Sequence, residues 1–572
     1  MTTAAVFLAA AQLFAPGTYK VVNYQNLTTV AEREFRGAPC LYVSGPAEEK
    51  DTAFRMTSSR IPLEADAKTF RLKFKAYAER RMYGTTGQGE GWNNAIHFYD
   101  AGGKKVSSQG LGFSIPRGDF SEIALAGPVP SGAASAAVQI GFDSPNLTTN
   151  VVAAYRDFTF DTLKEAKADK LVVRVKPVPL PSANPVRPKV IPVDRMPDTP
   201  AVTLRDDGMT LIGGEPFFPI GIYSVCRREF NGMDFDVAFR ELKEAGFNFA
   251  HTYGNPWEQA FLDGARKYGF KLWVGTRWPG KELIERGRFN PDIIAWYTGD
   301  DTSEHETPEE SRAYHDTLKA IDPTRLTCQA DNVCAAFDSS RYTDFVNSTD
   351  VFMPELYGIR GKAGDVTDTN CVAWCIKEMK GIWRDIKTCA NGQPKGVWPI
   401  LQSFKGWGGW GHYPTRRQIY ATTFATVIHG AHGVTWYTYG GFYSKKKGSR
   451  NEGITSSPER FADMAELATW LKELSPALLE RTGVQPPPAE ILAGPAKDCF
   501  DNDSVSCLLK RHCNETYLLT VNSTFEKVRA RFRLANVPAT AEVMRENRRA
   551  TLSAGLLEDD FEPFAVHVYR FN

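Results

Sequence analysis

The chain has 572 residues, which is too long for one ordinary hydrophobic core and predicts several domains. Its 68 Lys and Arg nearly balance its 67 Asp and Glu, so the chain carries no global electric field that would attract nucleic acid or an anionic membrane surface. We therefore expect no nucleic-acid partner, and a neutral substrate fits this balance best.

The start of the chain is apolar and rich in small residues. Residues 4–11 read Ala-Ala-Val-Phe-Leu-Ala-Ala-Ala, which resembles the hydrophobic part and the cleavage site of a secretion signal but lacks its positive N-terminal part. We expect residues 1–15 to be a signal remnant and the protein to be secreted or periplasmic. No run of 18 apolar residues occurs, so no membrane-spanning helix is expected.

Residues 16–165 show short alternating runs broken by Gly, Asn and Pro, which predict an antiparallel β-sandwich. The segments 92–103, 138–143 and 155–160 resemble the jelly-roll modules of carbohydrate-active enzymes, and this resemblance implies a carbohydrate-binding function. Four aromatic residues fit either sugar stacking or an ordinary sandwich core: Tyr83, Trp92, Phe98 and Tyr99.

A proline-rich linker is predicted over residues 166–202, and the pattern then changes to regular strand and helix alternation across residues 203–482. The expected strands cover residues 217–224, 247–253, 271–276, 293–301, 326–330, 350–357, 396–404 and 433–439. Helical patterns lie between them, for example over 235–245, 371–388 and 415–429, and a last one covers 457–474. Eight such alternations predict a (β/α)8 TIM barrel. Residues 483–572 return to strand alternation and predict a small C-terminal β-sandwich.

In a barrel of this kind, the residues that follow the strands converge at one face. The chemistry at these positions is aromatic rings, amides and a few carboxylates, which suits a carbohydrate site because sugar C–H faces stack on rings and glycosidic cleavage needs two carboxyl groups. The carboxylates are Asp300, Asp301 and Glu355. The expected substrate-binding residues are Tyr223, His251, Tyr253, Asn255, Trp278, Gln329, Tyr357, Gln402, Trp407, Trp410, Trp436 and Tyr437.

Several barrel motifs resemble the clan A glycoside hydrolases. They are Phe-Phe-Pro-Ile-Gly-Ile-Tyr at 217–223, Ala-Gly-Phe-Asn at 245–248, Ala-Trp-Tyr-Thr-Gly-Asp-Asp at 295–301, Asp-Pro-Thr-Arg at 322–325 and Gly-Val-Thr-Trp-Tyr at 433–437. In that clan the fourth strand ends in an Asn-Glu or Asp-Glu pair, whose second member is the acid/base. The matching residue here is Asp301, which is one methylene shorter than Glu. The resemblance therefore implies that Asp301 is the general acid and Asp300 an orienting group.

The chain departs from the clan at strand seven, where the clan places its nucleophilic Glu and this sequence reads Leu401-Gln402-Ser403-Phe404. Glu355, at the end of strand six, is the nearest alternative second carboxylate. A separation of about 5–5.5 Å between the two carboxyl groups would suit a retaining mechanism, and about 6.5–9.5 Å an inverting one.

Two other functions remain open. Adjacent Asp residues after strand four also resemble family 84 N-acetylhexosaminidases, in which the substrate acetamide is the nucleophile, Asp300 would orient it and Asp301 would donate the proton. The missing strand-seven Glu also fits a non-catalytic glycan-binding protein on a degenerate hydrolase barrel. Structural roles compete as well, since the Asp pair could cap a helix and Glu355 could pair with Arg360.

No metal or cofactor signature occurs in the sequence. His-Glu-x-x-His, zinc-spaced Cys pairs, a calcium loop and Gly-rich phosphate loops are all absent. We therefore expect a glycoside hydrolase that uses no cofactor and no metal, and whose partner is a carbohydrate substrate.

Overall fold

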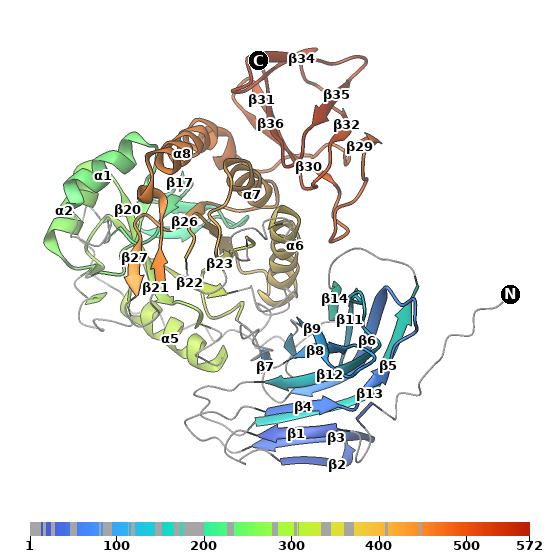
Figure 1. Cartoon of the computed structure of the whole chain (residues 1–572). Coiled ribbons are helices and arrows are strands. Elements are labelled where there is room, and N and C mark those ends of the chain that lie inside the picture. Colours follow the sequence, from blue (N-terminus) through green and yellow to red (C-terminus); the bar gives the residue numbers. More distant parts are fainter. Residues whose placement is uncertain are drawn as a thin grey trace. The chain divides into compact units, whose positions relative to one another are not determined.

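The computed structural model describes residues 13–14, 19–23, 29–45, 54–78, 82–83, 94–111, 114–115, 120–142, 151–164, 172–175, 199–225, 234–254, 256–276, 284–285, 287–302, 306, 308–332, 345–359, 371–406, 410–444 and 449–572 (Figure 1). The described residues up to Val175 belong to one compact unit, and those from Thr199 onward belong to a second. The predicted signal remnant and most of the predicted linker lie outside the described residues, apart from Leu13, Phe14 and a few positions at the linker's two ends.

The first unit consists of antiparallel sheets. Its strands are β1 (Tyr19–Asn23), β2 (Thr29–Phe35), β3 (Ala38–Gly45), β4 (Phe54–Ser58), β5 (Ile61–Pro62), β6 (Thr69–Ala78), β7 (Met82–Tyr83), β8 (Ala95–Tyr99), β9 (Lys105–Gly110), β10 (Ser114–Ile115), β11 (Ser121–Pro128), β12 (Ser135–Phe142), β13 (Val151–Leu163) and β14 (Val172–Val175). One sheet has the order β1-β4-β12-β8-β9, with β5 beside β12, and the other has the order β14-β11-β6-β13-β3-β2.

The two large sheets share one hydrophobic core, as the predicted sandwich requires. On β6, Phe70, Leu72 and Phe74 are fully buried while the residues between them face outward. Residues of the opposite sheet, such as Ile96 and Phe98, belong to the same core. Phe98 therefore packs inside the sandwich, and Tyr99 lies under the guanidinium of Arg60 at 4.0 Å. Trp92 lies outside the described residues.

The second unit begins with a small antiparallel sheet of β15 (Val202–Leu204), β16 (Thr210–Ile212) and β17 (Glu215–Phe217). The barrel strands follow: β18 (Ile220–Ile222), β19 (Phe249–Ala250), β20 (Lys271–Gly275), β21 (Ile293–Gly299), β22 (Leu326–Asn332), β23 (Val351–Leu356), β24 (Gly396–Val397), β25 (Ile400–Gln402) and β26 (Val434–Tyr437). All neighbours are parallel, and the pairing of β22 with β23 closes the ring.

The seventh barrel strand is interrupted. Both β24 and β25 pair with β23, and Pro399 separates them. Proline has no backbone N–H, so it cannot donate to the ladder. Because β24 and β25 are two parts of one interrupted strand, the barrel has eight strand positions, which confirms the predicted TIM-barrel fold.

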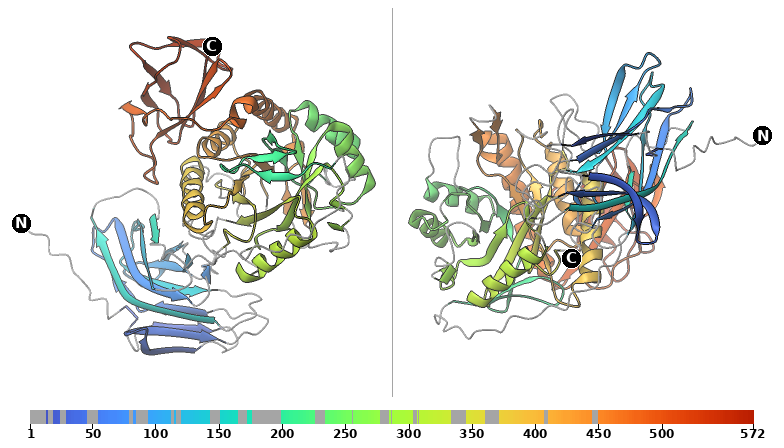
Figure 2. Two further views of the ribbon diagram at one scale, coloured as in Figure 1. Left: turned by 180° about the vertical axis from the view of Figure 1, so that it is seen from behind. Right: turned by 90° about the horizontal axis from the view of Figure 1, so that it is seen from below.

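Helices surround the barrel strands (Figures 1 and 2). They are α1 (Phe235–Glu244), α2 (Gln259–Tyr268), α5 (Pro308–Ile321), α6 (Cys371–Cys389), α7 (Arg416–Ile428) and α8 (Pro458–Leu479); the 3-10 helix η4 (Ile454–Ser456) and the hairpin of β27 (Phe442–Ser444) and β28 (Ser449–Asn451) follow the last barrel strand. Thr415 and Gln418 form a capping box at the start of α7. Among the described helices, none is both long enough and apolar enough to cross a membrane.

The C-terminal strands form two sheets around a separate core. They are β29 (Glu490–Ala493), β30 (Val505–His512), β31 (Glu515–Asn522), β32 (Val528–Arg533), β33 (Thr540–Val543), β34 (Arg548–Thr551), β35 (Leu556–Phe561) and β36 (Val566–Phe571). The orders are β29-β32-β35 and β30-β31-β36-β33-β34, and both sheets contribute to the core. This sandwich contacts the barrel helices, since the Asn502 amide donates to the carbonyl of Ala373 in α6 at 3.0 Å.

Candidate active site

Aromatic side chains from several strands meet at the carboxyl end of the barrel. Tyr223 follows β18, His251 follows β19, and Tyr437 ends β26. The ring of Tyr223 lies 4.9 Å from that of His251 and 6.0 Å from that of Tyr437. Tyr253 extends the cluster on one side and Tyr357 on the other, with ring distances to Tyr437 of 6.3 and 6.1 Å. Parallel strand ends thus form one continuous aromatic wall, as predicted for this fold.

Asp300 is the carboxylate that this wall holds most directly. The hydroxyl of Tyr297 donates to its Oδ1 at 2.6 Å, and the hydroxyl of Tyr253 donates to its Oδ2 at 3.0 Å. Tyr223 in turn donates to the Tyr297 hydroxyl at 3.3 Å. Asp300 is therefore fixed in place as a hydrogen-bond acceptor.

The phenols themselves stay protonated. Burial raises the pKa of Tyr297 well above its usual value, and the negative charge of Asp300 raises it further. Burial and then Asp300 have the same effect on the pKa of Tyr223. Because neither phenol ionises at ordinary pH, both remain donors, and the chain from Tyr223 through Tyr297 to Asp300 keeps one direction.

Glu355 lies at the end of β23 with its residue only 8% exposed. Burial raises the pKa of Tyr357 well above its usual value, and Glu355 raises it further; the more distant Asp300 contributes in the same direction. The pKa of Tyr223 also responds to both carboxylates. Electrostatic effects of this kind weaken with distance. Glu355 and Asp300 therefore both lie near enough to act electrostatically on the same phenols.

Asp301 occupies a tight bend after β21. Its φ is 48°, in the left-handed region that costs a residue other than glycine on the order of 1 kcal/mol. Its residue is half-buried, and its Oδ1 atom is shielded from solvent. The carboxyl group is therefore turned partly inward at the end of the strand.

His251 is a neutral wall residue at ordinary pH. It is 2% exposed, and burial lowers its pKa to about 3. Its ring stacks on Trp273, with 5.2 Å between centroids. Its Nδ1 has no hydrogen-bond partner among the described residues. His251 is therefore an uncharged imidazole at the pH of most assays, and its Nδ1 atom is shielded from solvent.

The other predicted amides are buried. Gln402 accepts from the Ile359 N–H at 2.9 Å and donates to the carbonyls of Ile359 and Phe404 at 3.1 and 3.3 Å, so its amide fixes the chain after β23. Gln329 is 1% exposed, and its oxygen accepts from the hydroxyl of Ser348 at 3.0 Å.

The predicted tryptophans divide into different groups. Trp410 lies beside the wall, 5.9 Å from the ring of Tyr357, and donates its indole N–H to the carbonyl of that residue. Trp436 is completely buried and packs edge-on against Phe247, which places it in the core. Three predicted binding residues lie outside the described residues: Asn255, Trp278 and Trp407.

Tyr297 was not among the predicted site residues, but its hydroxyl lies between Asp300 and Tyr223. It lies inside the apolar run 293–299, where both strand faces are buried, so aromatic residues on the two faces look alike in sequence. Alternation would have separated them: Trp296 faces outward and donates to Asp322 at 3.0 Å, while Tyr297 faces inward.

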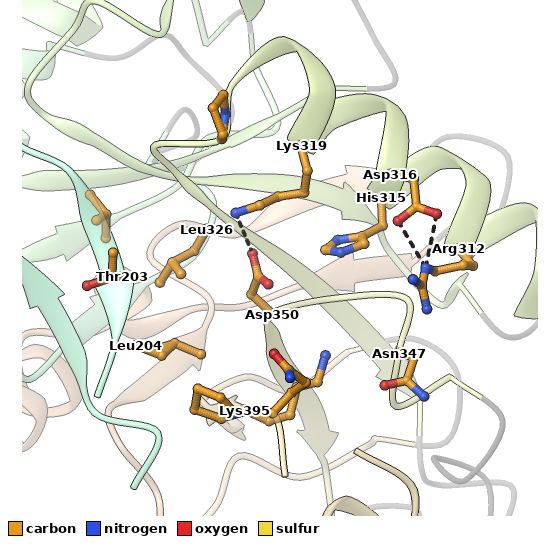
Figure 3. A pocket seen from close by; sticks show the side chains of 14 residues that line it. Thr203, Leu204, Arg312, His315, Asp316, Lys319, Leu326, Asn347, Asp350 and Lys395 are labelled. Carbon is orange, nitrogen blue, oxygen red and sulfur yellow. Dashed lines mark hydrogen bonds and ion pairs between the residues drawn. The ribbon is translucent and has the colours of Figure 1, made fainter. Parts of the chain in front are cut away.

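A cavity of about 360 Å³ lies at the other end of the barrel, at the amino ends of β22 and β23 (Figure 3). Lys319 pairs with Asp350 at 3.1 Å, and the ammonium of Lys395 donates to the Thr349 carbonyl at 2.5 Å. Burial lowers the pKa of Lys395 to about 8, against the attraction of Asp350. These charges are largely compensated within the cavity wall. In TIM barrels the amino end of the strands serves stability, whereas catalysis takes place at the carboxyl end. We assign this cluster a structural role.

The part of the chain that the structure describes contains no group of three or more His, Cys, Asp or Glu arranged to hold a metal ion.

No protein-family model matches the chain, and no curated protein matches it. Solved structures with a similar barrel include a family 5 glycoside hydrolase from Bacteroides vulgatus, with 14% identity, 65% of this chain and 92% of that chain covered, and a TM-score of 0.42. An alpha-amylase from Geobacillus thermoleovorans in complex with acarbose has 11% identity, 62% and 98% coverage, and a TM-score of 0.40. A family 2 beta-galacturonidase from Eisenbergiella tayi has 11% identity, 79% and 97% coverage, and a TM-score of 0.38. These are all glycoside hydrolases, but at such values the likeness identifies neither a family nor an activity for this chain.

Proposed function

We propose that the protein is a glycoside hydrolase whose active site is the aromatic wall at the carboxyl end of the barrel. One observation carries the proposal: Asp300, with Asp301 beside it, is bound by two tyrosines of the aromatic wall, and Glu355 at the end of β23 acts electrostatically on the same group of tyrosines. Two carboxyl groups and several rings in one pocket are what glycosidic cleavage and sugar stacking require.

Asp301 is the proposed general acid. Asp300 already accepts hydrogen bonds from two phenols, which hold it as an acceptor, so we assign it an orienting role. Asp301 follows it directly, half-buried at the same strand end. Asp300 then orients the substrate or the acid, and Glu355 serves as nucleophile or general base. Tyr253, Tyr357, Tyr437 and Trp410 are the proposed sugar contacts.

Leaving-group dependence tests the role of Asp301. A general acid matters most for a poor leaving group, because a nitrophenolate departs without a proton. A panel of aryl glycosides and polysaccharides first identifies a substrate. Asp301→Asn should then lower kcat/KM about 10²- to 10⁴-fold for an alkyl or unactivated aryl glycoside, and far less for the 2,4-dinitrophenyl glycoside of the same sugar.

Glu355→Gln is the matched comparison, since a lost nucleophile or base should impair both substrates alike. If Asp301→Asn hydrolyses the two substrates with the wild-type ratio of rates, Asp301 is not the acid. If wild-type protein binds glycans without releasing product, the non-catalytic reading replaces the proposal.

A substrate-assisted hexosaminidase is the second candidate. Gln402 lies where a strand-seven nucleophile would be and is hydrogen-bonded to the backbone of Ile359. Asp300 is held as a hydrogen-bond acceptor and could accept a hydrogen bond from a substrate acetamide N–H. This mechanism requires a 2-acetamido sugar. Hydrolysis of a 2-acetamido glycoside with inhibition by a thiazoline mimic would support it, and equal activity on the 2-hydroxy analogue would exclude it.

A further inference from the structure

We propose that the first unit binds an anionic polysaccharide that carries carboxylate groups, through an arginine-covered aromatic patch on the outer face of one sheet. The aromatic patch consists of Phe35, Tyr42, Tyr77 and Phe120, from or next to β2, β3, β6 and β11. The ring of Phe35 lies 5.2 Å from that of Tyr42 and 5.0 Å from that of Tyr77, and the ring of Phe120 lies 5.9 Å from that of Tyr77.

This patch is separate from the sandwich core. On β3, Leu41 and Val43 face the core, so Cys40 and Tyr42 between and beside them face outward. Tyr77 and Cys40 are nevertheless only 5% and 7% exposed. A buried floor on the outer face of a sheet needs a cover, and arginine side chains supply it.

Three guanidinium groups lie over the rings. Arg33 lies 3.2 Å from the centroid of Tyr42, Arg36 lies 4.5 Å from that of Tyr77, and Arg156 lies 4.4 Å from that of Phe120. A guanidinium stacked on a ring is attracted by the negative face of the ring and presents its N–H groups at its edge. At Arg36 one of these N–H groups donates to the Tyr77 hydroxyl at 3.4 Å. The stacking also restricts the side chain before a ligand arrives, which reduces the entropic cost of binding.

Positive charge lies over the aromatic patch. Arg33 and Arg36 are exposed residues, whereas the floor beneath them is buried. Asp161 pairs with Arg71 at 2.6 Å, outside the patch. Asp157 lies between two cations, 2.9 Å from the Lys75 ammonium and 3.9 Å from the Arg156 guanidinium, so these pairs leave an excess of positive charge. The rings beneath these guanidiniums form one series of contacts, from Tyr42 through Phe35 and Tyr77 to Phe120. The arginines therefore converge on a small area.

The ligand chemistry follows from the arginine edges. A planar carboxylate accepts two parallel N–H bonds from one guanidinium, so carboxylates repeated along a chain match several arginines on a flat sheet face. The nearly neutral whole chain supplies no general attraction for polyanions, so any such affinity is local. The choice of a saccharide over other polyanions rests on the proposed function of the barrel.

Binding of polygalacturonate to the full-length protein tests the inference without any need for catalysis. Affinity electrophoresis and calorimetry should show binding to polygalacturonate that weakens with salt, and much weaker binding to a neutral β-glucan. The double variant Arg33→Gln/Arg36→Gln should bind at least about tenfold more weakly. Arg71→Gln, which removes a cation of the same sheet outside the patch, is the matched control and should bind as wild type.

Arg33→Lys provides a second measurement should the double variant fold poorly. It keeps the charge but loses the planar fork, so it should bind polygalacturonate severalfold more weakly at an unchanged circular dichroism spectrum. The inference fails if wild-type protein does not bind polygalacturonate, if the arginine variants bind it unchanged, or if dextran sulfate or duplex DNA binds equally well. A failed hydrolysis panel together with arginine-dependent binding would reject only the proposed function of the barrel.

Discussion

Tyr297 determines how Asp300 is presented, since its hydroxyl links the carboxylate to Tyr223 behind it. The phenol is 4% exposed, so a ligand does not need to touch it for the contact to matter. Tyr297 is therefore a positioning residue, which acts through Asp300.

Tyr297→Phe should lower kcat about tenfold and leave KM nearly unchanged, because it removes one charge-assisted hydrogen bond without changing the pocket wall. Steady-state kinetics on the substrate found by the panel measures this. Tyr155→Phe is the control, since that buried hydroxyl has no partner among the described residues and lies in the other unit. An unchanged kcat for Tyr297→Phe would remove this hydrogen-bond chain from the mechanism.

Asp350 is a residue on which the stability of the barrel depends. Burial opposes its ionisation, but the attraction of Lys319, His315 and Lys395 and the hydrogen bond from the Thr327 N–H outweigh burial and hold its pKa well below the usual value. Its stabilising contribution is therefore complete above the pKa of the unfolded state, near 3.9, and falls as pH drops toward the lower folded pKa.

Asp350→Asn should lower the free energy of unfolding by about 2 kcal/mol at pH 7, because it leaves Lys319 and Lys395 without their carboxylate. Urea unfolding at pH 7 and pH 3 should show a smaller difference from wild type at the lower pH. Asp503→Asn, in the exposed pair with Lys497, should change stability by no more than about 1 kcal/mol. A difference that grows at pH 3 would contradict the assignment.

At the scale of elements, two neighbouring side chains stabilise the start of α7. The Thr415 side chain accepts from the Gln418 N–H, and the Gln418 side chain accepts from the Thr415 N–H. This pair satisfies two of the N–H groups that a helix start leaves without intrahelical partners.

Thr415→Ala should therefore lower the free energy of unfolding by about 1 kcal/mol. Thr388→Ala near the end of α6 is the comparison. Thr388 is exposed, and its hydroxyl donates to the carbonyl of Arg384 one turn earlier in the same helix, so it caps no helix start. Chemical denaturation of both variants measures the difference. Equal stabilities would mean that tertiary packing, and not the capping box, fixes the start of α7.

The elements were more predictable than the site. Strand and helix alternation over residues 203–482 predicts the barrel because each helix has an apolar face and recognisable ends, as α1 shows with Asp234 before it and Gly246 after it. The inward and outward faces of a barrel strand are both apolar, so hydrophobicity alone did not place Trp436 in the core or Tyr297 in the wall. Strand alternation was the signal that separates the two faces. The hydrogen bonds of Gln402 to Ile359 also depend on long-range contacts that no local pattern reveals.

At the scale of the whole molecule, the barrel and the C-terminal sandwich share polar contacts. Asn502 is 4% exposed, donates to the Ala373 carbonyl and to Asp498, and accepts from Lys380 at 3.1 Å. His429 at the end of α7 lies 3.0 Å from the hydroxyl of Ser506. These contacts couple the stability of the two parts.

Asn502→Ala should lower the melting temperature of the barrel and of the sandwich together, with a loss of about 1–3 kcal/mol from the buried groups left unpaired. Scanning calorimetry and near-UV circular dichroism measure both. Asn514→Ala, in the exposed turn between β30 and β31, should leave the melting temperature unchanged. If only the sandwich transition moves in Asn502→Ala, the two parts are not coupled through this contact.

Among the described strands, β2 lies at one edge of the sheet that carries the aromatic patch, and this position affects how molecules meet in concentrated solution. An edge strand presents unpaired backbone groups onto which another chain could add. Here Glu32, Arg33 and Glu34 are consecutive and exposed along that edge. Charged side chains at such a position oppose the stacking of strands from neighbouring molecules, and the closed barrel has no comparable edge to offer. We therefore expect this edge of the sheet to resist pairing with strands of neighbouring molecules.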